Sequence, residues 1–242
     1  MAKPTGMKVE LAGITKVYGG IRALNEVRLE FSPGRIVAVV GLNGAGKSTL
    51  LQAMAGLLAF KKGDVYYDDE PFTRDRVDFR KRLAFLPDFP VAYTHMTVLE
   101  HIAMVLHLYE KDGPGAEERV LDLLRAFSMV PLARAPMGAL SRGQLYKAAL
   151  IALIAAAPEL WLLDEPMASG MDALGLREFE KSARTAAARG ATIIYTTQIL
   201  SVAQRFSDEV VVLNQGRVHT HETTRKIEAE GNLEELFEAL KE

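Results

Sequence analysis

Short apolar runs separated by turn residues fill the first part of the chain. Residues 7–40 alternate apolar and polar positions between turn sequences such as Tyr18-Gly19-Gly20 and Ser32-Pro33-Gly34, a pattern typical of half-buried antiparallel strands. The apolar run that ends at Val40 predicts a buried strand, and residues 63–67 predict a further strand. We therefore expect an antiparallel β layer that leads into a buried strand.

The middle of the chain changes to a helical period. From Thr97 to about Pro131, apolar residues recur at spacings of three and four, which favours helices over strands. The sequence Lys-Asp-Gly-Pro-Gly at 111–115 interrupts this period and predicts a break between two helices. We expect a block of helices inserted into the chain here.

Strands and helices alternate through the second half of the chain. The expected elements are a helix led by Ser141 that runs to Ala157, a strand at 160–163, a polar helix at about 173–188, strands at 192–197 and 209–214, and an amphipathic helix from Asn232 to Lys241. Such alternation implies a parallel sheet that is covered on both faces. The fold class is therefore α/β.

One stretch after the buried strand carries the spacing of a phosphate-binding loop. It consists of Gly41, Leu42, Asn43, Gly44, Ala45, Gly46, Lys47, Ser48 and Thr49. Its glycines allow backbone N–H groups to face inward, and the helix that follows adds the positive end of its dipole. Lys47 supplies a charge for the β- and γ-phosphates, and the Ser48 hydroxyl is placed to ligate Mg²⁺. The stretch predicts binding of a nucleoside triphosphate.

A phosphate loop needs an acidic partner for its metal ion, and the strand at 160–163 ends in Asp164, Glu165 and Pro166. Carboxylates at the carboxyl end of such a strand lie where open α/β sheets bind ligands. Asp164 is expected to hold Mg²⁺ through Ser48 or water. Glu165 points the other way along the pleat, towards a water that could attack the γ-phosphate.

A second anion site is indicated by Leu140-Ser141-Arg142-Gly143-Gln144 at the start of an alanine-rich helix. Ser141 and the N–H groups after it form an anion-binding helix N-terminus, although on its own the short sequence is more typical of a plain helix cap. A single chain has one γ-phosphate to hold and one loop that already binds it. Two such sites therefore suggest ATP shared between two chains.

Composition narrows the class of protein further. A length of 242 residues suits one domain with an inserted subdomain. A net charge of −2 disfavours binding to nucleic acid, and the lack of cysteine excludes disulfides and thiolate metal sites. No apolar stretch is long enough to cross a bilayer, so we expect a cytosolic chain.

These motifs together resemble the nucleotide-binding subunit of ATP-binding cassette (ABC) transporters, from about Lys8 to the C-terminus. Tyr18 occupies the position whose ring stacks on adenine. Residues 41–49 match the Walker A loop, 140–144 the LSGGQ signature and 160–165 the Walker B strand, and Asp172 takes the acidic position of the D-loop in 168–172. In its overall style, the chain is similar to the exporter branch of the family, in which the permease is a separate chain.

The resemblance implies a P-loop NTPase (RecA-like) parallel sheet core with an N-terminal antiparallel β subdomain and an inserted α-helical subdomain. Residues 1–242 would then form a single cassette. Its parts would be a nucleotide-binding core at about 7–90 and 151–216, a helical signature subdomain at about 91–150 and a tail at about 217–242.

The resemblance also implies cofactors and partners. Two chains would sandwich ATP and Mg²⁺, with Ser141, Gly143 and Gln144 of one chain contacting the ATP that the other chain holds. The second chain could be identical or different. The pair would dock onto an integral-membrane permease, which places the chain in the cytoplasm, peripheral on the inner face of the membrane, with no nucleic-acid partner.

The sequence departs from the family at positions that sense or cleave the γ-phosphate. Arg142 replaces a signature glycine, and its guanidinium could meet a phosphate or a carboxylate. Asp88 stands where a glutamine usually lines the metal, and it can still reach Mg²⁺ directly or through water. Gln198 stands where the family has a histidine that supports Glu165. A glutamine cannot carry the positive charge that a histidine can. The D-loop also holds one extra residue.

These departures predict intact ATP binding with slowed hydrolysis. Electrostatic stabilisation at Gln198 is weaker than a histidine would give, so we count Gln198 with Glu165 as the catalytic pair and expect a low rate. The favoured hypothesis is an ATP-hydrolysing motor for a permease. The alternative is a weakly hydrolytic, ATP-dependent clamp or regulatory cassette.

Overall fold

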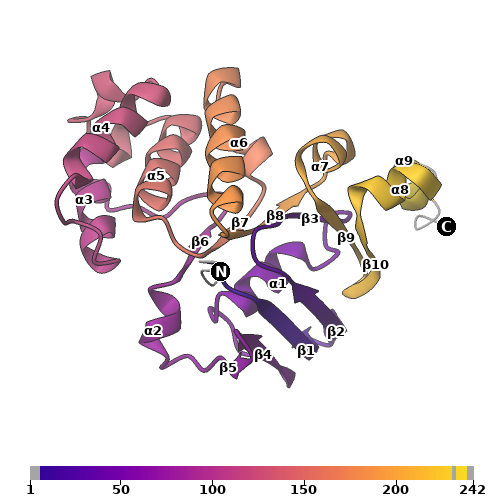
Figure 1. Cartoon of the computed structure of the whole chain (residues 1–242). Coiled ribbons are helices and arrows are strands. Elements are labelled where there is room, and N and C mark those ends of the chain that lie inside the picture. Colours follow the sequence, from indigo (N-terminus) through magenta and orange to yellow (C-terminus); the bar gives the residue numbers. More distant parts are fainter. Residues whose placement is uncertain (1–5, 231–232, 239–242) are drawn as a thin grey trace.

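Two sheets form the framework of the molecule (Figure 1). The structure is a computed structural model that describes residues 6–230 and 233–238. Its strands are β1 (Val9–Tyr18), β2 (Ile21–Phe31), β3 (Ile36–Val40), β4 (Lys62–Tyr67), β5 (Glu70–Pro71), β6 (Leu83–Leu86), β7 (Leu160–Leu163), β8 (Thr192–Thr197), β9 (Glu209–Asn214) and β10 (Arg217–Thr223). Its α-helices are α1 (Lys47–Met54), α2 (Val77–Arg80), α3 (Val98–Leu108), α4 (Ala116–Ala126), α5 (Arg142–Ala156), α6 (Ala173–Ala188), α7 (Leu200–Phe206), α8 (Thr224–Glu230) and α9 (Leu233–Glu238).

The larger sheet has the strand order β10-β9-β3-β8-β7-β6. Its strands run parallel from β9 to β6, and only β10 pairs antiparallel, with β9. The smaller sheet, β2-β1-β4-β5, is antiparallel throughout. The predicted α/β class, with a parallel core and an N-terminal antiparallel layer, is confirmed.

Strand β3 lies at the centre of the larger sheet and packs on both faces. Ile36, Ala38 and Val40 join the core under the helices, whereas Val37 and Val39 join the core shared with α1 and the smaller sheet. Because successive strand side chains point to opposite faces, a wholly apolar strand is what a doubly covered sheet needs. This packing fixes where the chain leaves β3.

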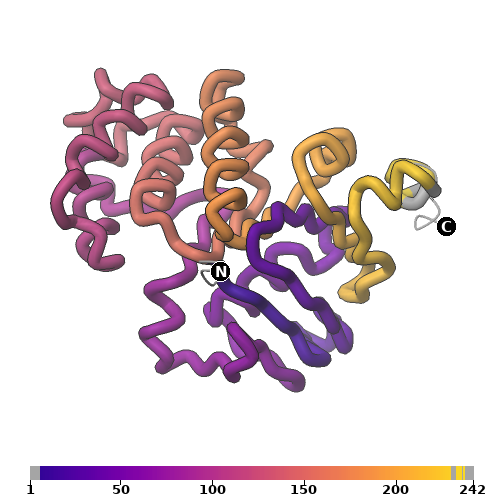
Figure 2. Tube along the Cα trace, viewed as in Figure 1, coloured from indigo at the N-terminus to yellow at the C-terminus, as the bar shows by residue number. Residues whose placement is uncertain are grey.

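Helices α3, α4 and α5 gather at one end of the molecule, on the far side from the C-terminal helices (Figures 1 and 2). Helix α3 begins with a capping box, in which the Thr97 hydroxyl accepts from the Glu100 N–H and the Glu100 carboxylate accepts from the Thr97 N–H. Helix α5 is apolar on all sides and is almost completely buried between α3, α4 and α6.

Several short elements are absent from the prediction. Strand β6 and helices α2, α7 and α8 are each seven residues or fewer, which is too short for a clear period. Helix α9 falls within the helix expected at 232–241, whose ends lie outside the described residues. In the described parts of the chain, no helix is both long and apolar enough to cross a membrane.

Candidate nucleotide site

Four neighbouring strands of the larger sheet end at the same edge. Val40 pairs with Thr197, Leu163 with Tyr195, and Leu86 with Leu163. The residues that follow these strands are the phosphate loop after β3, Gln198 after β8, Asp164 after β7 and Asp88, two residues after β6. Residues far apart in sequence therefore meet at the carboxyl edge of the sheet, where α/β folds bind ligands.

The phosphate loop is held close to two neighbouring strands. A Cβ on Gly41 would lie 2.3 Å from the Leu213 carbonyl oxygen, and one on Gly46 would lie 2.3 Å from the Ala23 carbonyl oxygen. Gly46 also has a φ of 106°, which a side chain would strain. It precedes α1, whose first N–H groups have no partner within the helix and, with the positive end of the helix dipole, favour the binding of an anion.

Lys47 is only 6% exposed and reaches back into the loop. Its ammonium donates to the Gly41 carbonyl at 2.9 Å and to the Leu42 carbonyl at 3.4 Å. The same nitrogen lies 3.5 Å from Glu165 Oε1. A buried ammonium held by carbonyls and one carboxylate is a charge placed for an anionic ligand.

Thr196 joins the two carboxylates that follow β7. Its hydroxyl donates to Asp164 Oδ1 at 2.7 Å and accepts from the Glu165 N–H at 2.8 Å. Asp164 is buried, whereas the Glu165 side chain is 15% exposed. One threonine therefore orients the backbone of the predicted base and the side chain of the predicted metal ligand.

Glu165 has a left-handed backbone, with a φ of 46°. A residue before proline is disfavoured in helical regions, and a left-handed residue other than glycine costs about 1–3 kcal/mol. This left-handed conformation turns the chain sharply after β7. Beyond it, Gln198 Nε2 donates to Asn43 Oδ1 at 2.9 Å and reaches Glu165 Oε1 at 3.4 Å. Gln198 thus links the phosphate loop to the predicted base.

Asp88 forms an ion pair with Arg142, whose Nη2 lies 2.5 Å from Asp88 Oδ1. Both side chains are about half exposed, at 46% and 47%. The pair connects two positions at which the sequence departs from the resembled family. Of the two partners that we expected for the Arg142 guanidinium, a carboxylate is the one found.

The start of α5 has the predicted cap. The Ser141 hydroxyl accepts from the Gln144 N–H at 3.3 Å, and the Gln144 side chain accepts from the Ser141 N–H at 3.0 Å. A Cβ on Gly143 would lie 2.1 Å from the Gly170 carbonyl, so the D-loop packs directly on the signature. Asp172 caps α6 through the Gly175 N–H and accepts from the buried Lys147 at 2.7 Å.

The loop and the strand ends enclose an open cavity of about 420 Å³. Its lining residues are Ala23, Asn43, Gly44, Ala45, Gly46, Lys47, Ser48, Thr49, Asp88, Asp164, Glu165 and Gln198. Most of the predicted loop residues and every predicted metal or catalytic residue therefore share one site. Tyr18, Ser141, Gly143, Gln144 and Asp172 do not line it.

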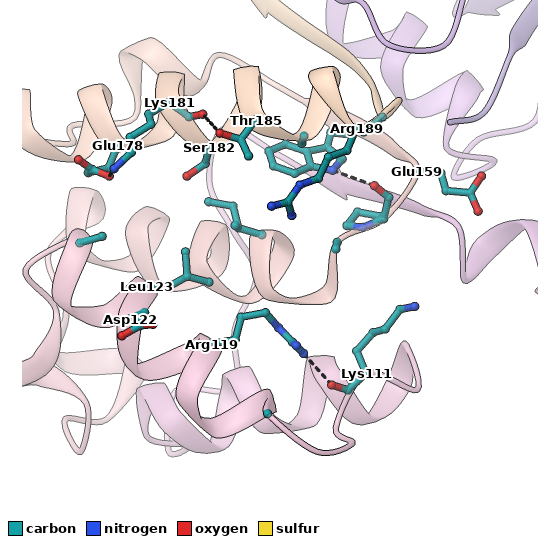
Figure 3. Close-up of a pocket in the computed structure, with 18 of the residues that line it drawn as sticks. Lys111, Arg119, Asp122, Leu123, Glu159, Glu178, Lys181, Ser182, Thr185 and Arg189 are labelled. Carbon is teal, nitrogen blue, oxygen red and sulfur yellow. Dashed lines mark hydrogen bonds and ion pairs between the residues drawn. The ribbon is translucent and has the colours of Figure 1, made fainter. Parts of the chain in front are cut away.

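A larger hollow lies elsewhere, between α4, the end of α5 and α6, with a volume of about 960 Å³ (Figure 3). Charges of both signs surround it, including Arg119, Asp122, Glu178 and Lys181. Arg119 donates to the Lys111 carbonyl there. This hollow shares no lining residue with the cavity at the phosphate loop. Its mixed charge does not favour a nucleotide.

The oxygen groups at the loop suit Mg²⁺ bound together with phosphates. Ser48 follows Lys47 on α1, and Asp88 and Asp164 line the same cavity. Among residues 6–230 and 233–238, no three histidine or acidic side chains cluster as a metal cage. Mg²⁺ commonly takes one or two carboxylates plus substrate phosphates and waters, so this sparse oxygen set fits it.

Sequence reasoning missed residues that hold the site together. In the sequence, Thr196 is an ordinary residue of a strand, and Ala23 belongs to the antiparallel layer. Lys147 lies in an alanine-rich helix, and nothing next to it in sequence indicates a role. A buried threonine or lysine in an otherwise apolar element is a signal for a polar partner, but the sequence alone does not identify that partner.

Comparison with known protein families decides what kind of cassette this is. The model of the family described as "ABC transporter" matches residues 24–168, more than half of the chain. The chain belongs to the ABC transporter family. It is therefore an ATP-binding subunit that hydrolyses ATP and works with a separate membrane permease. Nothing in the match distinguishes the exporter branch.

Curated relatives are ATP-binding proteins of transporters. The chain is 28% identical over 222 residues to EcsA, an ABC-type transporter ATP-binding protein of Bacillus subtilis, with 90% of each chain covered. It is 32% identical over 226 residues to the sulfate/thiosulfate import ATP-binding protein CysA of Bacillus cereus. The match covers 91% of this chain and 63% of CysA, so the chain spans less than two thirds of that relative.

Solved structures agree with the fold. An ATP-binding subunit of an ABC transporter superposes with a TM-score of 0.90 at 28% identity, covering 97% of this chain and 99% of that one. The cassette MJ0796, solved as a dimer in a post-hydrolysis state with ADP and phosphate, gives a TM-score of 0.80 at 26% identity. That match covers 90% of this chain and 99% of MJ0796.

Proposed function

We propose that two copies of this cassette bind two ATP molecules between them. In each composite site, the phosphate loop comes from one copy and the start of α5 from the other. The observation that carries this proposal is that Ser141, Gly143 and Gln144 lie outside the cavity of their own loop, although Ser141 is exposed at a capped helix N-terminus. Such an N-terminus binds anions. The dimeric MJ0796 cassette supports the arrangement.

Within one copy, residues 41–49 would hold the phosphates through their backbone N–H groups. Lys47 would neutralise the β- and γ-phosphates, and Tyr18 would stack on adenine from the exposed end of β1. Asp172, at the start of α6, would position the D-loop beside the partner's nucleotide.

Ser48, Asp164 and Asp88 would hold Mg²⁺, directly or through water. The ion supplies charge neutralisation across the β- and γ-phosphates when it is bound. Thr196 fixes the direction of the Asp164 carboxylate, so this ligand needs no rearrangement. Asp88 is less fixed because its only described partner is the exposed Arg142.

Glu165 would orient the attacking water and accept its proton. Its carboxylate lies between the Lys47 ammonium and the Gln198 amide, which keeps it at the mouth of the loop. The neutral amide of Gln198 donates a hydrogen bond without adding charge. Charge that develops on the γ-phosphate would therefore be stabilised less strongly than by a protonated histidine.

The segment after Asp88 has the properties of a permease-docking surface. Phe89, Val91 and Tyr93 lie in the loop between β6 and α3, and Val91 is 89% exposed. Exposed apolar side chains gathered on one loop mark an interaction site. Because the same loop contains Asp88, contact with the permease would report directly on the nucleotide site. The chain would then be peripheral on the membrane.

Replacing Val91 and Phe89 by serine should release the chain from membranes that contain its permease. We expect at least a severalfold loss of the membrane-bound fraction, because apolar contacts of about 1.5–3 kcal/mol per buried side chain are removed. ATP hydrolysis by the purified chain should not change. The measurement is quantitative sedimentation with membranes. The exposed Leu57, replaced by serine, is the matched control, and equal retention of both variants would contradict the docking surface.

Replacing Gln198 by histidine should raise the rate of ATP hydrolysis. Exchanging a neutral donor for a charged one adds about 1 kcal/mol of transition-state stabilisation, or roughly fivefold in rate. Steady-state phosphate release at saturating ATP measures this. The affinity for ATP should stay within about twofold of that of the unmodified chain, because the loop contacts remain.

An unchanged rate in Gln198→His would show that Gln198 does not limit hydrolysis. The Arg142–Asp88 ion pair would then be the departure to test, and it also favours the alternative of a weakly hydrolytic clamp. The two functions differ in cells: a motor loses activity in Glu165→Gln, whereas a clamp keeps it.

A further inference from the structure

Tyr146 carries a buried hydroxyl that has no partner. The residue is 0% exposed on α5, and within the described residues its hydroxyl makes no hydrogen bond. A buried polar group left unpaired costs about 1–3 kcal/mol, and most such groups in proteins are paired. The unpaired hydroxyl therefore indicates that a partner reaches it in another arrangement of the site.

The negative charges of the nucleotide site act on this hydroxyl. Burial raises the pKa of Tyr146 well above its usual value, and the charges of Asp164, Asp88 and Glu165 raise it further. The phenol thus stays protonated and is a hydrogen-bond donor, whereas ionised carboxylates only accept. One of these three carboxylates is the natural acceptor.

Asp88 is the carboxylate that is free to move. Asp164 is fixed by Thr196, and Glu165 lies between Lys47 and Gln198. Among the residues that the structure describes, Asp88 is held only by Arg142, in a half-exposed ion pair of a kind that contributes about 0–1 kcal/mol.

Arg142 and Tyr146 lie four residues apart on α5, so they occupy the same helix face about one turn, or ~6 Å, apart. Tyr146 is the more deeply buried of the two. If the Asp88 carboxylate moves inward along this face, it leaves the Arg142 guanidinium and reaches the Tyr146 hydroxyl.

We propose that Tyr146 is a positioning residue for the magnesium site. Its hydroxyl donates to the Asp88 carboxylate when Asp88 turns from Arg142 towards Asp164 and Ser48. Arg142 competes for the same carboxylate and holds it outward. The inference rests on the proposed role of Asp88 as a metal ligand, and it couples the signature helix of each chain to that chain's own metal site.

Tyr146→Phe tests the hydroxyl alone, because the ring and its packing remain. At a fixed concentration of a fluorescent ATP analogue, we expect the Mg²⁺ concentration that gives half-maximal enhancement of binding to rise roughly three- to tenfold, as one hydrogen bond allows. Binding in EDTA should not change. The melting temperature should stay the same or rise, since an unpaired buried hydroxyl is removed.

Two further variants sharpen this test. Arg142→Gln should lower the Mg²⁺ requirement, because Asp88 loses its outward partner. Tyr195→Phe is the matched control: Tyr195 is equally buried, but its hydroxyl is hydrogen-bonded to Ser207 at 2.8 Å. This control should lower the melting temperature and leave the Mg²⁺ requirement unchanged.

The Asp88→Asn background separates the possible failures. If Tyr146 acts through Asp88, Tyr146→Phe has little further effect in that background. A full effect there, or no effect of Tyr146→Phe in a chain whose Mg²⁺ requirement does respond to Asp88→Asn, overturns the role of Tyr146 and leaves that of Asp88. If Asp88→Asn itself leaves the Mg²⁺ requirement unchanged, both the role of Asp88 and this inference are overturned.

Discussion

Glu165→Gln should abolish most ATP hydrolysis while ATP still binds. Glutamine keeps the size of the side chain but cannot accept a proton from water, and loss of a general base costs about 10²–10⁴ in rate. Most of the binding contacts remain: Lys47 loses the carboxylate charge 3.5 Å away but keeps its hydrogen bonds to the Gly41 and Leu42 carbonyls. Phosphate release at saturating ATP and titration with a fluorescent ATP analogue measure the two properties.

A matched control for this variant is Glu178→Gln on α6. Glu178 pairs with Lys181 on the same helix and lies outside the nucleotide cavity. Its replacement should change neither rate nor affinity. If Glu165→Gln hydrolyses ATP at the rate of the unmodified chain, another group activates the water, and our assignment of Glu165 is wrong.

Lys47→Ala should weaken ATP binding more than any other single change in the loop. The substitution removes a buried charge from the phosphate site, and charge-assisted hydrogen bonds contribute about 1.5–3 kcal/mol, or roughly 10- to 100-fold in affinity. It also leaves Glu165 without the cation that lies 3.5 Å away. Equilibrium titration with a fluorescent ATP analogue measures the loss.

Lys181→Ala controls for the loss of one positive charge, because Lys181 is 73% exposed on α6. Its affinity for ATP should match that of the unmodified chain. Tight ATP binding by Lys47→Ala would place the phosphates away from this loop.

Much of the fold follows from local patterns. The strand that ends at Val40, the loop after it and the strand before Asp164 were predictable because an apolar run and a rigid motif stand next to each other in sequence. The helices that begin after Thr97 and Ser141 were predictable because their caps are local.

The links between distant residues could not be predicted in the same way. Asp88 and Arg142 are 54 residues apart, and no pattern in either segment indicates that β6 ends beside the start of α5. Thr196 reads as an ordinary strand residue until the sheet order places it next to Asp164. Tyr146 looks like core because α5 is apolar on all sides, and only its unpaired hydroxyl distinguishes it.

In the structure, the residues that depart from the family are linked to one another or to the nucleotide site. Arg142 and Asp88 are two unusual residues in sequence, but in the fold they are partners. Gln198 joins the loop to Glu165 through hydrogen bonds that a neutral amide can make. In the proposed site, the Walker A and Walker B residues keep the pattern of the family, and the departures lie where the γ-phosphate would be.

In the proposed composite site, ATP is bound between two copies of this chain. The molar mass of Glu165→Gln, measured by light scattering with and without ATP and Mg²⁺, tests it most directly. We predict a monomer of 26.6 kDa without nucleotide. With ATP and Mg²⁺, we predict a dimer that holds two ATP molecules. Replacing Ser141 by arginine in the same chain should prevent the dimer without preventing ATP binding. A chain that binds one ATP and stays monomeric would contradict the composite site.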